Sequence, residues 1–212
     1  MLRIVRAASG PAWLCGAAIA AAGCASPATT FHSTWRNPAA APMTLAGQKV
    51  VALVICADDP ARRKAEDALA RQITARGAQG VAAWTLLPTA DAPDEEKARA
   101  ALAGSGAAGV VTMQVLGRED AAEPRVDVRS AGYRSFWGNY RWSSQVAWTP
   151  GRSSAPHVWV ETLVHSLAPD TLLWSGRSRS ADPNEVTALF DEVGEAAAGE
   201  MAKAGLLRAP GR

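Results

Sequence analysis

The chain has 212 residues, of which 48% are hydrophobic, and it carries 22 basic and 20 acidic side chains. This near-neutral balance excludes a strongly basic nucleic-acid-binding protein and an acidic disordered chain. The apolar content is enough for the core of one domain, and only one segment is long and apolar enough to interact with lipid, which excludes a protein with several membrane spans.

Residues 1–23 have the features of a secretory signal. Two arginines, Arg3 and Arg6, precede an apolar stretch from about Ala12 to Ala22. That stretch is shorter than the ~20 residues that a membrane-spanning helix needs, so we expect it to be an export signal and not a membrane anchor.

The end of this signal predicts a lipid anchor. The sequence Ala21-Ala22-Gly23-Cys24 resembles a bacterial lipobox, in which small residues precede a cysteine that becomes the acylated first residue of the mature chain. The alternative is cleavage at an A-x-A-like site, with Cys24 an incidental thiol. Ala25 follows instead of Asp, which by resemblance to proteobacterial sorting favours the outer membrane, with the domain facing the periplasm.

Removal of the signal leaves 20 basic and 20 acidic side chains and one unmodified cysteine, Cys56. No intramolecular disulfide is then expected, and Cys56 follows an apolar run in which a buried, inert thiol is expected. Residues 24–48 contain three prolines and little periodicity, so they are expected to form a tether, from which Phe31 and Trp35 could pack onto the domain edge. A single domain over 49–207 and a short tail over 208–212 complete the expected organisation.

The first half of the domain predicts alternating strands and helices. Val50–Cys56 is a continuous apolar run rich in β-branched residues, as expected of a strand covered on both faces. Asp59 and Pro60 predict the start of a helix, with Asp59 as its N-cap, Arg63 and Asp67 as an exposed ion pair and Gly77 as its end. A strand over 81–87, a helix over 94–103 and a strand over 109–116 follow. Right-handed crossovers make these three strands parallel.

The second half predicts an antiparallel hairpin over 158–166 and 171–180, followed by a helix from Asp182-Pro183 to near Gly205. We therefore expect an α/β fold with a mixed sheet of about five strands and three helices. On the first hairpin strand, His157, Glu161 and His165 share one side. Four residues of strand span roughly 13 Å, too far for one metal ion, so no metal site is predicted and an exposed sheet face is expected.

The segment 118–156 is too long for an ordinary connection and is rich in aromatic residues. Arginines are interleaved with these aromatics, and Trp, Tyr and Arg dominate binding hot spots. Two interpretations stay open: the aromatics fill the open face of the sheet, or some stay accessible and bind a protein or glycan. The candidate partner-binding residues are Tyr133, Phe136, Trp137, Tyr140, Trp142 and Trp148.

Catalytic and cofactor motifs are weak in this sequence. The match Gly104–Gly109 to G-x-G-x-x-G lies after a helix and before a strand, the reverse of the order that a dinucleotide site needs, so no cofactor is predicted. Asp58 and Asp59 lie at the carboxyl end of a predicted parallel strand, where α/β active sites usually lie, and paired carboxylates can act as acid and base. Helix capping explains Asp59 equally well.

Several motifs resemble those of a set of proteobacterial outer-membrane lipoproteins without known activity. They are Cys24, Arg62-Arg63 with Glu66-Asp67, Val160-Glu161-Thr162-Leu163, and Leu173-Trp174-Ser175-Gly176-Arg177. The order of elements is also similar to that of the TolB amino-terminal domain and of lipoproteins that activate penicillin-binding proteins. These resemblances imply the predicted α/β fold and a place in the envelope, but a fold alone implies no function.

The sequence therefore favours a lipid-anchored, non-catalytic binding or scaffolding module of the bacterial cell envelope. Its expected partners are the membrane, through the lipid, and an envelope protein or a peptidoglycan-associated partner, with no nucleic acid. Two alternatives remain: an envelope enzyme that uses Asp58 or Asp59 in a cleft, and a glycan or small-ligand binder that uses the aromatic residues.

Overall fold

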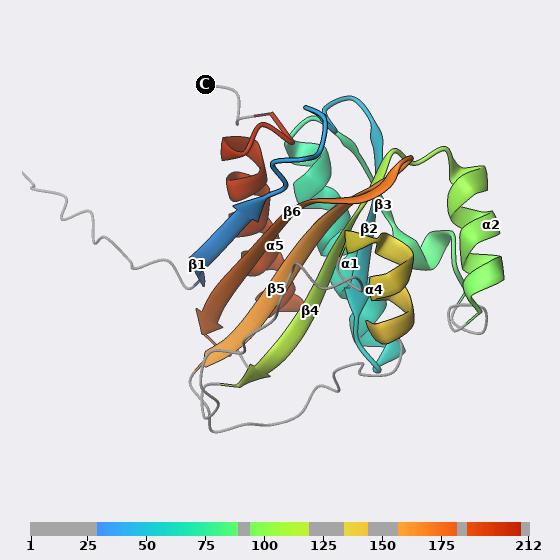
Figure 1. The fold of residues 1–212 in the computed structure, drawn as a ribbon. Coiled ribbons are helices and arrows are strands. Elements are labelled where there is room, and N and C mark those ends of the chain that lie inside the picture. Colours follow the sequence, from blue (N-terminus) through green and yellow to red (C-terminus); the bar gives the residue numbers. More distant parts are fainter. Residues whose placement is uncertain (1–28, 89–93, 119–133, 144–156, 182–185, 209–212) are drawn as a thin grey trace, which may run out of the picture.

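The computed structural model describes residues 29–88, 94–118, 134–143, 157–181 and 186–208. These residues form an α/β fold in which one six-stranded mixed sheet is covered by helices on both faces (Figure 1). The strands are β1 (Thr29–Arg36), β2 (Lys49–Ile55), β3 (Gln79–Ala82), β4 (Gly109–Arg118), β5 (His157–Leu167) and β6 (Asp170–Ala181). The helices are α1 (Asp59–Ala75), the short 3-10 helix η1 (Ala83–Thr85), α2 (Glu95–Ser105), α4 (Phe136–Ser143) and α5 (Val186–Lys203).

The strand order is β1-β6-β5-β4-β2-β3, which places β1 and β3 at the two edges of the sheet. β2 pairs in parallel with β3 and with β4, as predicted from the crossovers. β5 and β6 form the predicted antiparallel hairpin, and β4 joins it through an antiparallel pairing with β5. The sheet is thus parallel on one side and antiparallel on the other.

β2 is buried on both faces, and this explains its continuous apolar sequence. Val50, Ala52 and Val54 pack into the core beneath α1 and α5, whereas Val51 and Leu53 pack into the core beneath α2 and α4. The core beneath α1 and α5 is the larger of the two, and α5 contributes residues to it along most of its length. The residues of α5 in this core are Leu189, Phe190, Val193, Ala197, Ala198 and Met201.

The sixth strand is β1, which lies inside the segment 24–48 that was expected to be a tether. β1 pairs antiparallel with β6 over the register from Thr29↔Ser180 to Arg36↔Trp174. Phe31 packs on Trp174 at 6.1 Å between ring centroids, and Trp35 packs against Leu163 and Leu172. The two aromatic residues anchor this strand to the sheet edge, although its other residues are mostly polar.

The strand expected over 81–87 is shorter and lies earlier, because β3 covers Gln79–Ala82 and the chain then turns into η1. α1 approaches β3 so closely that a Cβ on Gly80 would lie 2.1 Å from the carbonyl oxygen of Ala70. Two hydroxyl groups bond this edge strand: Thr74 Oγ1 accepts from the Gly80 N–H at 3.1 Å, and Thr85 Oγ1 donates to the Ala82 carbonyl at 2.7 Å.

The expectation of an exposed sheet face at His157, Glu161 and His165 is wrong. Glu161 and His165 are fully buried, and His157 is half-buried. Glu161 lies between two polar neighbours on adjacent strands: it accepts from Gln114 Nε2 at 2.9 Å and forms an ion pair with Arg177 Nε at 3.4 Å. The ion pair and hydrogen bond satisfy the carboxylate and allow it to be buried. Among the described residues, no group of three or more His, Cys, Asp or Glu side chains is placed to hold a metal ion.

Candidate functional site

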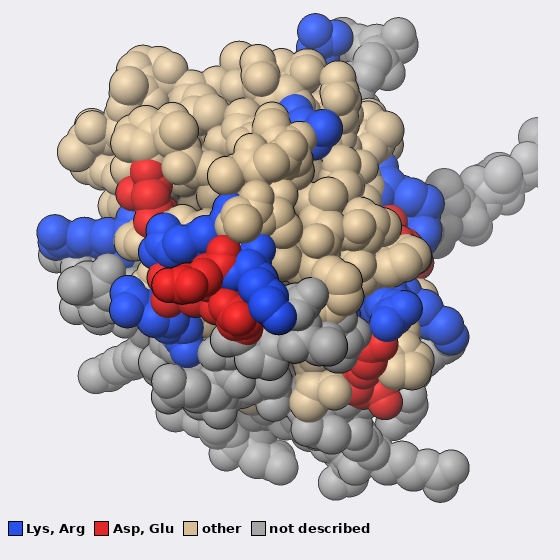
Figure 2. Space-filling model, turned by 90° about the vertical axis from the view of Figure 1, so that its right-hand side faces the viewer, with Lys and Arg blue, Asp and Glu red and all other residues tan. Residues whose placement is uncertain are grey.

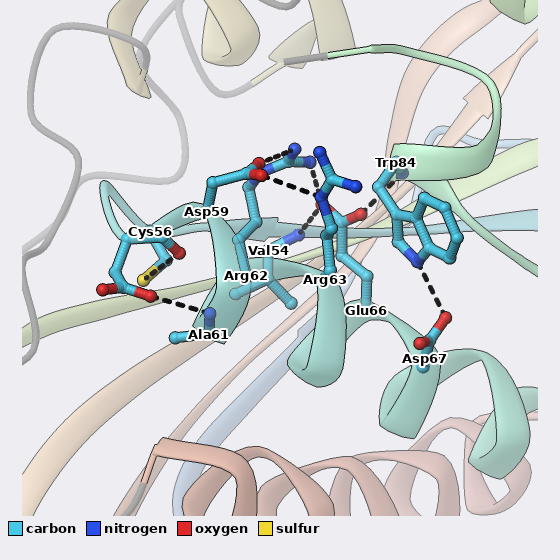
Figure 3. Close-up of polar contacts among 10 residues, drawn as sticks. Val54, Cys56, Asp59, Ala61, Arg62, Arg63, Glu66, Asp67 and Trp84 are labelled. Carbon is cyan, nitrogen blue, oxygen red and sulfur yellow. Dashed lines mark hydrogen bonds and ion pairs between the residues drawn. The ribbon is translucent and has the colours of Figure 1, made fainter.

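The candidate site is the carboxyl end of β2. The helix that follows β2, α1, packs on one face of the sheet, whereas α4, the next described helix after the neighbouring strand β4, packs on the other face. The connections therefore switch faces between these two strands. Such a switch point is where α/β proteins usually bind ligands. Ten residues in contact make up the network shown in Figure 3, which we call the β2–α1 cluster. Its members are Val54, Cys56, Asp58, Asp59, Ala61, Arg62, Arg63, Glu66, Asp67 and Trp84.

Asp58, and not Asp59, is the N-cap of α1. Its carboxylate accepts from the Ala61 N–H at 2.8 Å, and its carbonyl accepts from the Arg62 N–H at 2.8 Å. The helix begins at Asp59 with Pro60 in its first turn, one residue earlier than expected. Asp58 thus satisfies one of the unpaired donors of the first turn, which is the ordinary role of an aspartate at this position.

Asp59 is held by two arginines. Its Oδ1 lies 2.6 Å from Arg62 Nη2 and its Oδ2 lies 2.8 Å from Arg63 Nε. The i,i+4 partner of Arg63 is therefore Asp59, and not Asp67 as expected. Asp67 instead accepts from the indole Nε1 of Trp84 at 2.8 Å, and the Arg63 guanidinium lies over the Trp84 ring at 5.5 Å from its centroid.

Glu66 is the buried centre of the cluster. Its Oε1 accepts from the Val54 N–H at 3.3 Å and from Arg62 Nη1 at 3.1 Å, and its Oε2 accepts from the Trp84 N–H at 2.7 Å. β3 pairs with β2 only as far as Ala52↔Ala82. The carboxylate therefore accepts from the Val54 N–H just beyond the point where β3 ends, and from the Trp84 N–H within η1.

Burial dominates the electrostatics of the cluster. Desolvation raises the pKa of Glu66 to about 7, although Arg62 and the two backbone donors act to lower it. Desolvation also raises the pKa of the Cys56 thiol, whose Sγ–H donates to the Asp58 carbonyl at 3.7 Å. A raised pKa keeps this thiol protonated, and a protonated thiol is a poor nucleophile and a poor metal ligand.

Tyr140 of α4 approaches the cluster from the other face of the sheet. Burial raises the pKa of its hydroxyl, and the nearby Arg62 acts to lower it. Arg99 of α2 lies over the ring of Trp137 at 4.2 Å from its centroid, and Glu95 forms ion pairs with both Arg99 at 2.7 Å and Arg141 at 3.2 Å. These contacts form the seam between α2 and α4.

This geometry assigns a mechanical role to the cluster. Glu66 has no exposed surface, so a substrate in solution cannot reach it in this conformation. Asp58 caps a helix and Asp59 is engaged through both oxygens, so each of the two carboxylates named in the enzyme alternative has a structural partner. The cluster clamps β2, α1 and η1 together.

An open groove lies beside the cluster, between α1 and the edge strand β3. It has a volume of about 630 Å³ and is lined by Asp67, Ala70, Arg71, Thr74, Gly80, Val81, Ala82 and Thr85. The two threonine hydroxyls already bond the β3 backbone. On the side of α2, basic and acidic side chains lie next to one another and form no patch of one sign among the described residues in this view (Figure 2).

The six aromatic candidates divide into two groups. Phe136, Trp137 and Tyr140 of α4 are buried, with exposures of 0%, 8% and 6%, and they contact one another in the core beneath α2 and α4. For these three, the interpretation in which they fill the open face of the sheet is the one that the burial supports. Tyr133, Trp148 and the side chain of Trp142 lie outside the described residues.

The sequence interpretation missed Glu66 and Arg62 as the core of the cluster. The available signal was that Arg62 and Glu66 are opposite charges at i,i+4 on the helix after the first apolar strand. These two positions lie next to the helix face whose residues Ala65 and Leu69 pack in the core. The residues Arg62-Arg63 and Glu66-Asp67, which carry part of the resemblance to envelope lipoproteins, are all members of this cluster.

No known family profile and no curated protein matches this sequence. Solved structures with a similar fold include the PelC dodecamer from Paraburkholderia phytofirmans, which is 16% identical and has a TM-score of 0.40 over 79% of this chain and 95% of that chain. A dodecamer of the same protein with one Leu-to-Met substitution is 15% identical, with a TM-score of 0.40 over 77% of this chain and 95% of that chain. Within the described residues, no helix is long and apolar enough to cross a membrane.

Proposed function

We propose that the protein is a lipid-anchored lipoprotein of the bacterial cell envelope that faces the periplasm from the outer membrane, and that its α/β domain is a non-catalytic binding or scaffolding module. The observation that carries this proposal is the sequence Ala21-Ala22-Gly23-Cys24 at the end of a short apolar segment. The first strand, β1, follows only five residues after Cys24.

The use of the charged residues in the β2–α1 cluster supports a non-catalytic role. Asp58, Asp59 and Glu66 each bond to a helix, an arginine or a backbone donor, and Cys56 is a buried thiol with a raised pKa. Sites of catalysis place such groups where a substrate can reach them. Here the groups stabilise the packing of β2, α1 and η1 against one another.

The anchor is tested by fractionating cells that express the full chain or a Cys24→Ala variant. Since stable attachment takes more than one acyl chain, a triacylated Cys24 should hold the protein in the outer-membrane fraction after a salt wash. The Cys24→Ala variant should appear in the soluble periplasmic fraction. A variant that remains in the membrane fraction would contradict the anchor assignment.

The binding role is tested by crosslinking in the envelope, with mass spectrometry of the captured species. Trp142 and Trp148 are the candidates to substitute, because Trp137 is a core residue whose loss would disturb folding. Wild type and a Trp142→Ala/Trp148→Ala variant should differ in partner recovery while their thermal unfolding remains alike. Equal recovery would remove the aromatic segment as the binding surface.

A further inference from the structure

The distance between the proposed lipid and the domain is short. β1 begins at Thr29, five residues after Cys24. A chain spans at most ~3.6 Å per residue, so this connection reaches no more than about 18 Å. A tether over the whole of residues 24–48 would let the domain turn freely, whereas a connection of this shorter length holds the start of β1 close to the bilayer surface.

The start of β1 lies at one corner of the sheet. Thr29 pairs with Ser180 near the end of β6, and Ser180 pairs with Val158 near the start of β5. We call this place, with Thr29, Thr30, His157, Ser180 and Ala181, the lipid-proximal corner. The diagonally opposite corner is the start of β3, where Gln79 pairs with Lys49 at the start of β2.

The two corners are far apart. β1 and β3 lie at opposite edges of the sheet (Figure 1), five strand spacings from each other. At about 4.8 Å per spacing, the edges are separated by about 24 Å across the strands, and the two corners also lie at opposite ends along the strands. The two corners are thus further apart than the roughly 18 Å that the connection can span. If only the start of β3 rested on the lipid, the start of β1 would lie too far from the bilayer for the connection to reach Cys24.

The side chains of His32 and Arg179, which lie beside the lipid-proximal corner on β1 and β6, suit a headgroup layer. His32 is exposed on β1 and its ring contacts Trp159 edge-on at 4.9 Å between centroids. Arg179, half-buried on β6, lies 3.0 Å from His157 Nδ1 through its Nη2. Imidazole and guanidinium groups on apolar or aromatic bodies are the amphipathic side chains that favour a lipid interface.

We propose that the lipid-proximal corner rests against the bilayer surface and that the start of β3 points away from it. This orientation depends on the lipid anchor at Cys24, which is part of the proposed function. The partner of this surface is the phospholipid headgroup layer of the membrane that holds the acyl chains.

The orientation is tested with a fluorescent label at one of two exposed positions, introduced by Thr30→Cys or Gln79→Cys in the full, processed chain. The unsubstituted chain, whose buried Cys56 is its one unmodified thiol, gives the labelling background. In vesicles that contain a headgroup-attached quencher, the label at position 30 should be quenched at least twofold more than the label at position 79.

A longer connection tests whether the short distance between Cys24 and β1 is what fixes the orientation. An insertion of 12 Gly and Ser residues between Cys24 and Thr29 keeps the anchor and lengthens the connection. This insertion should reduce the quenching difference while the protein stays on the vesicles. Equal or reversed quenching in vesicle-bound protein without the insertion would overturn the orientation, whereas failure of the unsubstituted chain to bind membranes would overturn the lipoprotein assignment.

Discussion

The carboxylate of Glu66 on α1 accepts the backbone N–H of Trp84 at 2.7 Å, and this bond joins the helix to the place where β3 leaves the sheet. The same carboxylate bonds the Val54 N–H of β2 and the guanidinium of Arg62. One buried side chain thus joins α1, β2 and η1 beside the end of β3, which stops at Ala82 and not at residue 87 as expected.

Glu66→Gln should therefore destabilise the domain. In glutamine an NH2 group replaces one of the two carboxylate oxygens, and this group donates and cannot accept a hydrogen bond. The amide oxygen can replace only one of the two acceptors, so either the Val54 or the Trp84 N–H is left buried without its partner. The expected loss in the free energy of unfolding is about 2 kcal/mol at pH 6. Chemical denaturation measures it, with Glu96→Gln on the exposed face of α2 as the control, for which a change within about 0.5 kcal/mol is expected. A loss as small in Glu66→Gln as in the control would contradict the clamp.

The contribution of Glu66 should also depend on pH. Its pKa is about 7 in the folded protein against an ordinary value of 4.5. The folded state then binds the proton more tightly than the unfolded state, so this contribution to stability is fully present below pH 4.5 and is lost as pH rises through about 7. Both oxygens of a neutral carboxyl can still accept the backbone donors.

The measurement is the free energy of unfolding at pH 5, 6, 7 and 8 for wild type and for Glu66→Gln. The free energy of unfolding of wild type minus that of Glu66→Gln should decrease by up to about 3 kcal/mol from pH 5 to pH 8, because one pKa unit corresponds to about 1.4 kcal/mol. Arg62→Ala removes the cation beside Glu66 and should steepen the dependence. A difference between wild type and Glu66→Gln that stays constant from pH 5 to pH 8 would show that the pKa of Glu66 is not raised in the folded protein.

Gly80 and Gly104 offer a matched pair of glycine substitutions. A Cβ on Gly80 would lie 2.1 Å from the Ala70 carbonyl oxygen, whereas a Cβ on Gly104 meets nothing within 4 Å. Gly80→Ala should lower stability by about 1–3 kcal/mol or more because α1 must move away from β3. Gly104→Ala, inside α2, should raise stability by about 0.5–1 kcal/mol because alanine favours the helix. Thermal unfolding of both variants checks the signs, and equal shifts would refute the close approach of α1 to β3.

The seam between α2 and α4 should control how firmly α2 docks. Arg99→Ala removes the contact with the Trp137 ring and one ion pair of Glu95, which together are worth about 1 kcal/mol at a half-exposed site. Hydrogen exchange of the α2 amides should then accelerate several-fold, while the α1 amides should keep their protection. Glu96→Ala on the same helix is the control, and equal protection of α2 in Arg99→Ala and wild type would argue against the seam.

The parts of the fold that rest on local pattern were predictable. The apolar run of β2, the start of α1 beside Asp59-Pro60 and the alternation of valines along β5 each carry a signal within a few residues, although the N-cap of α1 is Asp58 and not Asp59. The structure confirms the parallel pairs and the hairpin. Val158, Val160 and Val164 face the core beneath α1 and α5, as their spacing predicts.

The missed features depend on contacts between distant segments. β1 has polar residues at most positions, and only its pairing with β6, about 140 to 150 residues further along the chain, makes it a strand. The burial of Glu161 depends on Gln114 and Arg177 on neighbouring strands. Glu66 is recognisable as a buried carboxylate only once β3 is known to end at Ala82, because the donors that it satisfies are backbone groups without a sequence signature.

The bonds made by Thr74 and Thr85 on the edge strand β3 have a consequence for crowding. Lipoproteins confined to a membrane diffuse in two dimensions at high local concentration, where an exposed strand edge can recruit a strand from a neighbouring molecule. In this protein, the Gly80 N–H and the Ala82 carbonyl are already bonded by threonine hydroxyls. If the protein is lipid-anchored as we propose, these two backbone groups are already engaged when copies meet on a membrane, and they are not open to a strand of a neighbouring copy.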